Sequence, residues 1–287
     1  MTETTSFGAP DAELKSAVRS HWEQETCGTR YSNASERKAW FDELAAARYE
    51  MEPYILPFAD FAALAKGKDV LEIGVGSGAD FLQWAKNARH ATGVDLTERG
   101  IELTGERLSL NEVPDDRYLL RRADAENLPF NDATFDIVYS WGVLHHTPDT
   151  PSAFAQAFRV LKPGGTLKAM IYHVPSWTGV LLVARYGWLR GNFRLTQKQA
   201  LFDHLESPGT KAYSLPEARA MLAKIGFSSI ELGTELANGD LMTLKLGDKY
   251  QGRAFRIIQA LYPTWLVRLL GRRFGLFMLI TARKPER

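Results

Sequence analysis

Short apolar runs alternate with amphipathic stretches through the middle of the chain. Runs rich in apolar and β-branched residues predict buried strands at 69–73, 91–95, 118–122, 135–140 and 166–172. Between them, apolar residues at helical spacing predict helices at 80–87, 98–110 and 151–161. Strands that alternate with helices build a parallel sheet with right-handed crossovers. The pattern therefore predicts an α/β protein with a doubly wound sheet.

The flanking regions follow other patterns. Residues 11–66 predict helices, interrupted by Pro53 and Pro57. Beyond residue 173 we expect an apolar stretch at 177–189, helices at 197–204 and 215–225, and two further strands at 227–232 and 276–282. The segment 233–275 between these strands is too long for a hairpin and too apolar for a loop. Insertions of this kind usually cap an active site or bind something.

Composition narrows the class of protein. A chain of 287 residues with 45% hydrophobic content can bury the core of one large domain, and a net charge of +1 argues against nucleic-acid binding. The lone Cys27 excludes an internal disulfide, and the six histidines are not at metal-ligand spacing, so we expect no metal. The polar first ten residues lack a signal core and no run is long enough to span a bilayer, which predicts a cytoplasmic protein.

A glycine-rich turn follows the first predicted strand and carries most of the chemical information. Gly74, Gly76 and Gly78 occupy alternate positions, so the backbone there can bend sharply and approach a ligand closely. Asp95 ends the next strand, where a carboxylate can bind the two hydroxyls of a ribose. Together these residues predict a nucleoside-containing cofactor at the carboxyl end of the parallel sheet.

Three features bear on which cofactor this is. The glycines alone also fit the G-x-G-x-x-A form of a dinucleotide site, at residues 74–79. Glu72, however, lies inside the strand before the turn, where a dinucleotide-binding strand is normally apolar. Asp124 ends the third strand, where it can accept a hydrogen bond from an adenine amine. Finally, residues 128–130 and 135–140 bring an aromatic ring and a new strand to the same pocket.

These residues resemble the class I S-adenosylmethionine-dependent methyltransferases. The resemblance covers about 66–172 and is carried by the turn at 72–78, Leu-Pro-Phe at 128–130, Phe-Asp-Ile-Val at 135–138 with Leu-His-His at 144–146, and Arg-Val-Leu-Lys-Pro-Gly-Gly at 159–165. It is nearest to the branch with the ubiquinone and menaquinone C-methyltransferases and many small-molecule enzymes. It implies a Rossmann-like sheet of seven strands, the last antiparallel, and methyl transfer from S-adenosyl-L-methionine to O, N or C of a small, apolar or lipid-like acceptor.

The resemblance also implies a division of the chain and roles for single residues. Residues 1–65 would form a helical lid, 66–173 the cofactor-binding core, and 174–287 the acceptor cap with the final strands. The implied cofactor contacts are Glu72, Gly74, Gly76 and Gly78 around the methionine, Asp95 on the ribose, Leu96, Asp124 and Ala125 on the adenine, and Ser140 beside the methionine carboxylate or sulfonium. Asp95 and Asp124 equally fit helix N-caps, and Ser140 fits a plain strand-end hydroxyl.

Methyl transfer from a sulfonium needs little catalytic machinery. Alignment and exclusion of water supply most of the rate, and a general base is needed only when the acceptor must lose a proton. His145, His146 and His173 follow predicted strand ends and are the candidates. The alternative for His145 and His146 is a pair of loop histidines that bond the backbone or pack under a helix. For His173 it is an exposed residue at a strand end.

Two further segments allow two interpretations each. The residues from His21 to Tyr31 combine aromatic rings, an arginine and a glycine, which fits either a lid over the cofactor or an arm that packs on the sheet. Residues 249–273 hold six cations, no acid and many apolar residues. This basic amphipathic pattern fits contact with an anionic membrane, or a pair of cap helices with a buried apolar face.

Three functions from different classes remain open at this point. A methyltransferase explains the ordered motifs together with the apolar insertions. A nicotinamide-dependent oxidoreductase would share the glycine turn, although Glu72 is unexpected there. A catalytically silent protein would bind the cofactor and use the fold as a scaffold or sensor.

Overall fold

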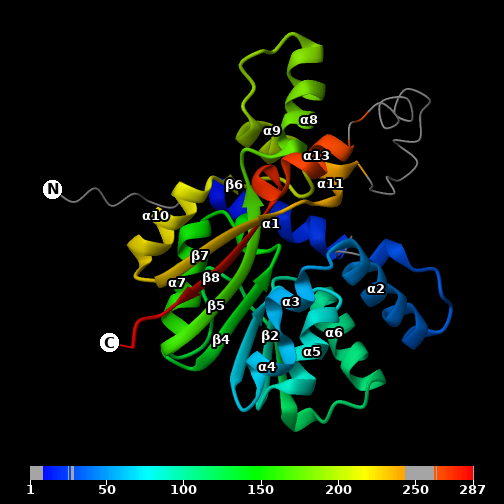
Figure 1. The fold of residues 1–287 in the computed structure, drawn as a ribbon. Helices are drawn as coiled ribbons and strands as arrows, with labels where there is room; N and C mark the ends of the chain where they lie inside the picture. Colours follow the sequence, from blue (N-terminus) through cyan, green and yellow to red (C-terminus); the bar gives the residue numbers. More distant parts are fainter. Residues whose placement is uncertain (1–8, 25, 27–28, 243–261, 263, 287) are drawn as a thin grey trace.

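The computed structural model describes residues 9–24, 26, 29–242, 262 and 264–286 (Figure 1). Their centre is a sheet of eight strands with the order β3-β2-β1-β4-β5-β8-β7, and β6 pairs with the end of β5. The strands are β1 (Asp69–Ile73), β2 (His90–Asp95), β3 (Tyr118–Arg122), β4 (Phe135–Trp141), β5 (Leu161–His173), β6 (Ala212–Tyr213), β7 (Ser228–Glu235) and β8 (Phe277–Arg283). Only β8 runs antiparallel to its neighbours, which confirms the predicted fold class.

Helices cover both faces of the sheet. One face carries α4 (Phe61–Ala65), α5 (Ala79–Asn87) and α6 (Glu98–Leu110), and the other carries α7 (Thr150–Val160) and α10 (Leu215–Ile225) (Figure 1). Successive strand residues point to opposite faces, so each strand supplies both cores. In β1, Val70 joins the first core with Trp84, and Leu71 joins the second with Phe154.

Local sequence signals account for most element boundaries. The predicted bounds of β1, β3, α6, α10 and α9 (Gln197–His204) agree with the structure. Thr97 caps α6 by accepting a hydrogen bond from Gly100, while α10 begins with a capping box between Ser214 and Glu217. The sequence pattern did not predict two short strand pairings. Strand β5 begins at Leu161 instead of residue 166, because Leu161 pairs with Phe135 before the chain turns at Gly164 and Gly165. The two residues of β6 are too few to show a period.

The amino-terminal helices gather at the carboxyl ends of the strands. They are α1 (Ala9–Gln24), η1 (Thr29–Tyr31), α2 (Arg37–Met51) and α3 (Ile55–Ala59). Pro53 separates α2 from α3 as expected. Pro57, however, lies within the first turn of α3, where backbone N–H groups have no acceptor inside the helix, so the missing N–H of proline costs no hydrogen bond. Lys15 of α1 reaches Asp124 beyond β3, and this contact fixes α1 across the sheet edge.

A helical cap projects beyond the same edge. It consists of α8 (Trp177–Tyr186), η4 (Trp188–Arg190) and α9, with α11 (Asn238–Leu241), α13 (Thr264–Leu270) and η6 (Arg272–Phe274) at its base (Figure 1). The predicted apolar stretch at 177–189 therefore forms α8 and η4. Most of the predicted basic segment 249–273 lies outside the described residues. Among the described residues, no helix has the length and apolar character needed to cross a membrane.

Candidate active site

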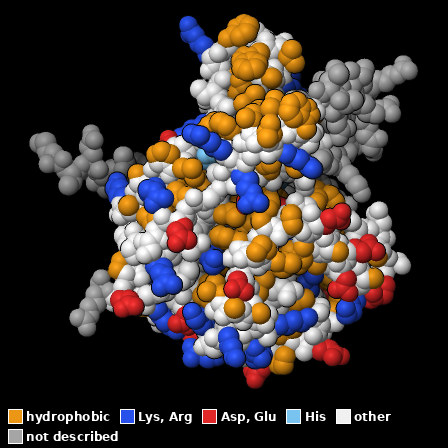
Figure 2. All heavy atoms as spheres, viewed as in Figure 1, with side chains coloured by type: hydrophobic (Ala, Val, Ile, Leu, Met, Phe, Trp, Pro, Cys, Tyr) orange, Lys and Arg blue, Asp and Glu red, His pale blue; other side chains and the backbone are white. Residues whose placement is uncertain are grey.

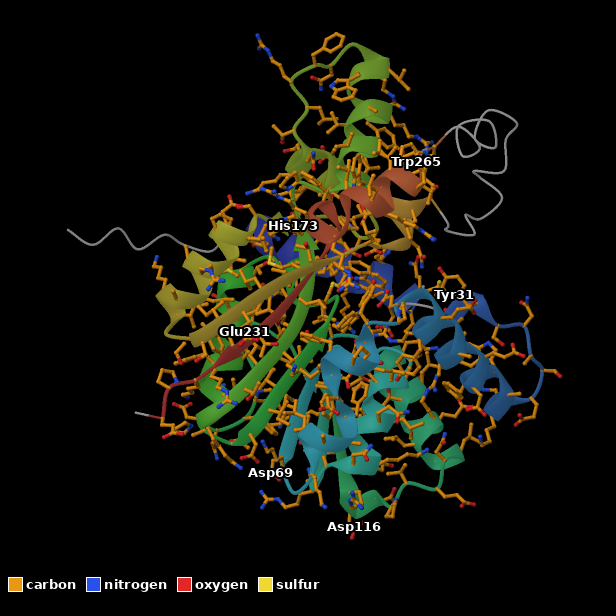
Figure 3. All side chains as sticks on the ribbon, in the orientation of Figure 1. Tyr31, Asp69, Asp116, His173, Glu231 and Trp265 are labelled. Atoms are coloured by element: carbon orange, nitrogen blue, oxygen red, sulfur yellow. The ribbon has the colours of Figure 1, made fainter. Side chains whose placement is uncertain are left out.

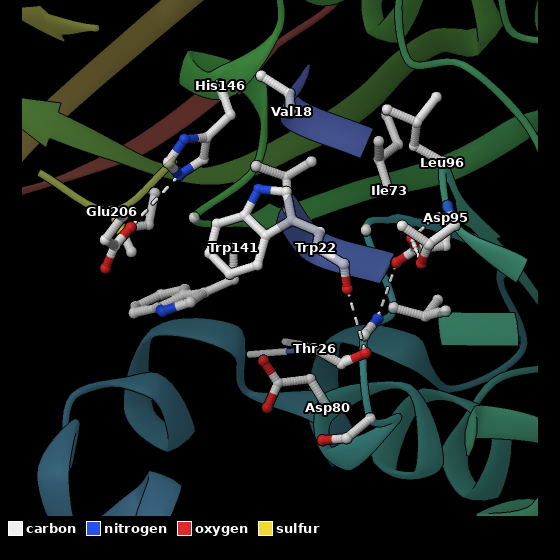
Figure 4. Close-up of a pocket in the computed structure, with 18 of the residues that line it drawn as sticks. Val18, Trp22, Thr26, Ile73, Asp80, Asp95, Leu96, Trp141, His146 and Glu206 are labelled. Carbon is white, nitrogen blue, oxygen red and sulfur yellow. Dashed lines mark hydrogen bonds and ion pairs between the residues drawn. The ribbon is translucent and has the colours of Figure 1, made fainter. Parts of the chain in front are cut away.

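A cavity of about 510 Å³ opens at the carboxyl ends of the central strands. Its walls come from the glycine turn, from the ends of β2, β4 and β5, and from α1, α2 and the cap. Figure 4 shows two ends: Asp95 and Leu96 lie at one, and Trp141, His146 and Glu206 lie at the other, with Trp22 between them. Carboxyl ends of parallel strands are where such sheets bind ligands.

The glycine turn has a conformation that needs glycine. Gly74, Gly76 and Gly78 have φ values of 86°, 53° and 76°, a region that L side chains rarely adopt. A Cβ on Gly74 would lie 2.2 Å from a Val143 methyl, and one on Gly78 would lie 2.9 Å from Thr104 Oγ1. A Cβ on Gly76 would meet open space. Gly74 and Gly78 therefore let Val143 and Thr104 pack directly against the backbone, whereas the backbone of Gly76 is bare toward the cavity.

Asp95 joins the turn to the start of α6. Its Oδ2 accepts a hydrogen bond from the Gly76 amide at 3.0 Å, and its Oδ1 accepts from the Thr97 amide and hydroxyl at 2.9 and 2.6 Å. The N-cap of α6 is Thr97, so the N-cap interpretation of Asp95 was wrong. The Asp95 side chain lines the cavity, as a ribose-binding carboxylate must.

Asp124 lines the same end of the cavity, beside Ala125. Its Oδ2 accepts a hydrogen bond from Lys15 Nζ at 2.7 Å, and its Oδ1 accepts from the Glu126 amide at 2.9 Å. Asp124 caps a turn and no helix begins there. Lys15 was missed by sequence reasoning, since nothing in a solvated helix shows that it will meet a residue 109 positions away.

Glu72 is buried at the end of β1 and lines the cavity. Its Oε2 has no hydrogen-bond partner among the described residues. Burial, together with the negative charge of Asp80, raises the pKa of Glu72 far above its ordinary value. An unpartnered buried carboxylate is costly, so this atom indicates a place for a hydrogen-bond donor or a cation.

A buried ion pair lies next to Glu72. Arg48 of α2 forms two hydrogen bonds to Asp80 of α5, at 3.0 and 2.6 Å, and Tyr139 donates a third at 2.9 Å. Sequence reasoning missed both charged residues. The position of Asp80, two residues after Gly78, could have indicated a place at the site, whereas nothing in the sequence around Arg48 indicates one.

Glu52 adds another carboxylate near Arg48, where its Oε2 accepts a hydrogen bond from the Trp141 indole at 2.6 Å. Burial raises the pKa of Glu52. In their ionised forms, Glu52, Glu72 and Asp80 bring three negative charges to this part of the cavity, against the single guanidinium of Arg48. The charge balance suits a ligand that carries more positive than negative charge.

His146 of η3 (Leu144–His146) is a buried residue that lines this cavity. Its Nδ1 lies 2.8 Å from Ser207 Oγ and 3.1 Å from Thr210 Oγ1. The Thr210 hydroxyl points its single proton at the carbonyls of Leu205 and Ser207, at 2.9 and 2.8 Å, so it accepts from His146. We therefore assign the proton to Nδ1 and the lone pair to Nε2.

The Nε2 atom has only a carboxylate near it. Glu206 lies 3.5 Å away, and no described residue forms a hydrogen bond to Nε2. Burial, aided by the positive charges of His21 and Lys211, lowers the pKa of His146 to about 3. The imidazole is thus neutral and keeps its lone pair at physiological pH.

The other predicted residues are buried in the surrounding core. Ser140 donates to the Ile73 carbonyl at 2.9 Å, and His173 donates from Nδ1 to the Gly275 carbonyl at 2.9 Å. His145 packs between His146 and Tyr172, at centroid distances of 4.2 and 4.1 Å. None of the three lines the cavity. The exposed interpretation of His173 was therefore wrong, because it is buried where β5 meets β8.

The amino-terminal segment lies against the cavity. Val18, Trp22, Thr26 and Tyr31 line it, and the Trp22 ring meets His146 edge-on at 5.4 Å (Figure 4). Tyr31 lies close to α2 (Figure 3). That this segment moves as a lid stays a prediction. Over the described ranges, no group of three or more His, Cys, Asp or Glu side chains is arranged to hold a metal ion.

Comparisons with known proteins agree with this architecture. Residues 71–169 match the methyltransferase domain family. The chain is 36% identical over 129 residues to 27-O-demethylrifamycin SV methyltransferase of Amycolatopsis mediterranei, a match that covers 45% of this chain and 47% of that protein. It is 39% identical over 112 residues to erythromycin 3''-O-methyltransferase of Saccharopolyspora erythraea, covering 38% and 36%. These matches thus span less than half of each relative.

A solved structure extends the likeness of fold to nearly the whole chain. Geranyl diphosphate C-methyltransferase from Streptomyces coelicolor A3(2) superposes with a TM-score of 0.61 at 15% identity, covering 96% of this chain and all of that one. Residues 71–169 are therefore similar to the methyltransferase domain family, and the superposition shows that the chain shares its fold with a protein solved in complex with S-adenosyl-L-homocysteine. The narrower branch with the ubiquinone and menaquinone enzymes stays a prediction.

Proposed function

We propose that this protein transfers a methyl group from S-adenosyl-L-methionine to a hydroxyl oxygen of a small, largely apolar or lipid-like molecule. The observation that carries the proposal is His146. Its Nε2, to which we assign the lone pair, is a buried nitrogen without a hydrogen bond from the described residues, and the His146 residue lines the same cavity as the glycine turn. A base is needed for a hydroxyl acceptor, whereas amine acceptors often react without one.

The site suits the cofactor in charge and shape. When bound, S-adenosyl-L-methionine supplies an electrophilic methyl group on a positively charged sulfur. Glu72 Oε2 would accept from its ammonium group, and the bare backbone at Gly76 would lie along the methionine. Asp95 would hold the ribose, while Leu96, Asp124 and Ala125 would surround the adenine. The excess of carboxylates over guanidinium matches a ligand with two positive groups and one negative group.

The reaction requires the protein to align the acceptor oxygen with the methyl group and to accept the proton of the acceptor hydroxyl. As the new bond forms at the acceptor oxygen, His146 Nε2 takes the hydroxyl proton. Glu206, at 3.5 Å, then stabilises the imidazolium, and the hydrogen bond from Tyr172 at 2.7 Å holds that carboxylate in place. Trp22 covers the ring and excludes water, which lowers the cost of charge movement inside the site.

The acceptor end of the cavity has several large apolar side chains besides His146 and Glu206, and they come from distant parts of the chain. Trp141, Met170, Tyr172 and Phe277 line it, together with Trp22 from the amino-terminal segment. We infer that residues 1–65 and 174–287 shape this end together with the ends of β4 and β5, while the rest of 66–173 holds the cofactor. The names of the two relatives describe O-methylation of rifamycin and erythromycin compounds, which supports a hydroxyl on a sizeable molecule.

The first test measures cofactor binding and turnover together. Titration calorimetry with S-adenosyl-L-methionine should give heat, and incubation with methyl-labelled cofactor should label the lipid fraction of a cell extract more than the aqueous fraction. Binding without consumption in any fraction would instead indicate the silent scaffold. Binding of NADH in its place would indicate the oxidoreductase.

Substitution of His146 tests the base. His146→Asn should lower kcat by about 10²- to 10⁴-fold, as expected for loss of a general base. The dissociation constant of S-adenosyl-L-methionine should not change, because His146 lies at the acceptor end. His90→Asn is the matched control, since His90 begins β2 at the opposite end of the sheet. Full turnover by His146→Asn would remove the base from the proposal.

A further inference from the structure

The large apolar side chains that are exposed gather on the cap. Ten such residues occur among the described residues, and eight of them belong to α8, the η4–α9 region and α13: Val180, Trp188, Leu189, Phe193, Phe202, Trp265, Leu269 and Leu270. Figure 2 shows apolar side chains at the tip of the cap and again at the base of the cap. Exposed apolar residues scattered singly are ordinary, but a concentration on one projection indicates a surface that is covered in use.

Two groups make up this surface, which we call the cap surface. Leu189 and Phe193 are 83% and 76% exposed at the tip, where the chain turns from α8 to α9. Trp265 and Leu269 are 69% and 73% exposed on α13 at the base. Trp265 projects from α13 beside the α8–α9 pair (Figure 3).

The charge on the cap surface is predominantly positive. Residues 177–204 and 264–274 contain a single acid, Asp203 of α9, although the whole chain has 34 acidic and 35 basic residues. The same two segments contain seven cations: Arg185, Arg190, Arg194, Lys198, Arg268, Arg272 and Arg273. The carboxylates that pair with Lys198 and Arg272 come from α10 and β7, outside the two segments.

We propose that the cap surface docks on an anionic lipid bilayer. Leucine, phenylalanine and tryptophan enter the interface between headgroups and acyl chains, and the surrounding arginines bind the lipid phosphates. A second copy of the chain fits the surface less well, because a two-fold dimer would bring two sets of cations together with few acids between them. Electrostatic complementarity therefore favours a membrane over self-association.

Docking would place the membrane next to the cavity. Thr178 of α8, Leu205 and Glu206 after α9, and Gly239 of α11 all line the cavity, so the cap forms a wall of the site and carries the cap surface on its outside. If the acceptor is lipid-like, the cap delivers it from the bilayer. That consequence depends on the proposed function, whereas docking itself does not.

Vesicle sedimentation of the full chain, without cofactor, tests docking. The protein should sediment with phosphatidylcholine vesicles that contain phosphatidylglycerol and stay in solution with phosphatidylcholine alone. The double variant Leu189→Glu/Phe193→Glu should lose sedimentation. The matched control is Leu56→Glu/Leu119→Glu, which places two glutamates at apolar sites that are each 46% exposed on α3 and β3. The control should sediment like the unmodified protein.

A second pair of variants tests the charge. Each cation near an anionic surface contributes about fivefold to partitioning, so Arg190→Gln/Arg194→Gln should bind such vesicles about 25-fold more weakly. Three outcomes would overturn the proposal: no sedimentation with anionic vesicles, equal loss in the matched control, or a dimer by light scattering that Leu189→Glu/Phe193→Glu converts to a monomer. Failure to bind vesicles would contradict membrane docking but would not affect methyl transfer in solution. The vesicle test and the activity test can therefore contradict the two proposals independently.

Discussion

At the scale of single residues, the site is defined by ionisable groups whose partners come from other elements. Arg48 neutralises Asp80, Lys15 neutralises Asp124, and Glu72 keeps an oxygen that no described residue satisfies. Burying a charge without a partner is expensive, so an unsatisfied carboxylate persists where a ligand completes it. Substitutions of these side chains are therefore the most direct tests of cofactor binding.

Asp95 gives one such test. Asp95→Ala removes the carboxylate expected to hold the ribose, so the binding free energy of S-adenosyl-L-methionine should weaken by about 1–3 kcal/mol. Titration calorimetry measures this directly. Thr97→Ala is the control, since it breaks a hydrogen bond to Asp95 and the cap of α6 but leaves the carboxylate in place. Equal loss of affinity in both variants would mean that Asp95 acts only through the fold.

At the scale of elements, the glycine turn is held from both sides. Arg107 of α6 donates a hydrogen bond to the Ser77 carbonyl at 2.7 Å and another to Phe41 of α2 at 2.9 Å. Thr104 packs under Gly78, and Val143 packs against Gly74. The turn is thus preformed, and a ligand that binds along it need not order the backbone.

Two glycine substitutions separate packing from binding. Gly76→Ala should cost about 1–2 kcal/mol of unfolding free energy for the left-handed backbone, without a clash, and should weaken cofactor binding, because the new methyl group points into the cavity. Gly78→Ala should destabilise the fold more, because its Cβ would also meet Thr104. Denaturation and calorimetry on both variants measure this. Wild-type cofactor affinity in Gly76→Ala would show that the ligand avoids this backbone.

At the scale of the whole molecule, the fold buries His145, His146 and His173 near the junction of the sheet with the cap. Burial lowers the pKa of each of them. An unfolded chain exposes all three to water, where a histidine titrates near about 6.5. The buried histidines therefore make stability depend on pH.

The sign of this dependence follows from proton binding. Between about pH 6.5 and the folded value of about 3, the unfolded state holds a proton on His146 that the folded state lacks. The free energy of unfolding should thus fall as pH decreases through this window, by about 1.4 kcal/mol per pH unit for each such histidine. Glu52 and Glu72 act in the opposite sense, because burial raises their pKa.

Comparison with a variant isolates one histidine. Urea denaturation of the unmodified protein and of His146→Asn between about pH 6.5 and pH 5 should show a shallower loss of stability in the variant, by about 1.4 kcal/mol per pH unit. The carboxyl contributions are common to both proteins and cancel. Identical slopes would mean that His146 is protonated in the folded state, which would also contradict its role as a base.

The sequence by itself determined the fold class and the position of the glycine turn at the cavity. Strand β1, the turn at Gly74–Gly78 and helix α6 each depend on residues close in the chain: an apolar run, positive φ angles, and a threonine cap. Such signals can be read directly, because their interactions close within a few residues. The resemblance to the methyltransferases rested on the same continuous segments, and the comparison at 71–169 confirmed it.

Only the tertiary structure decided which side chains complete the site. Arg48 meets Asp80 across 32 positions, Lys15 meets Asp124 across 109, and Thr210 fixes the His146 tautomer across 64. The same packing moved His145, His173 and Ser140 away from the cavity wall. Chain folding brings these groups together through the sheet order and the placement of α1, α2 and the cap. No local pattern records such distant contacts, because their energy depends on geometry that neither partner's neighbours determine.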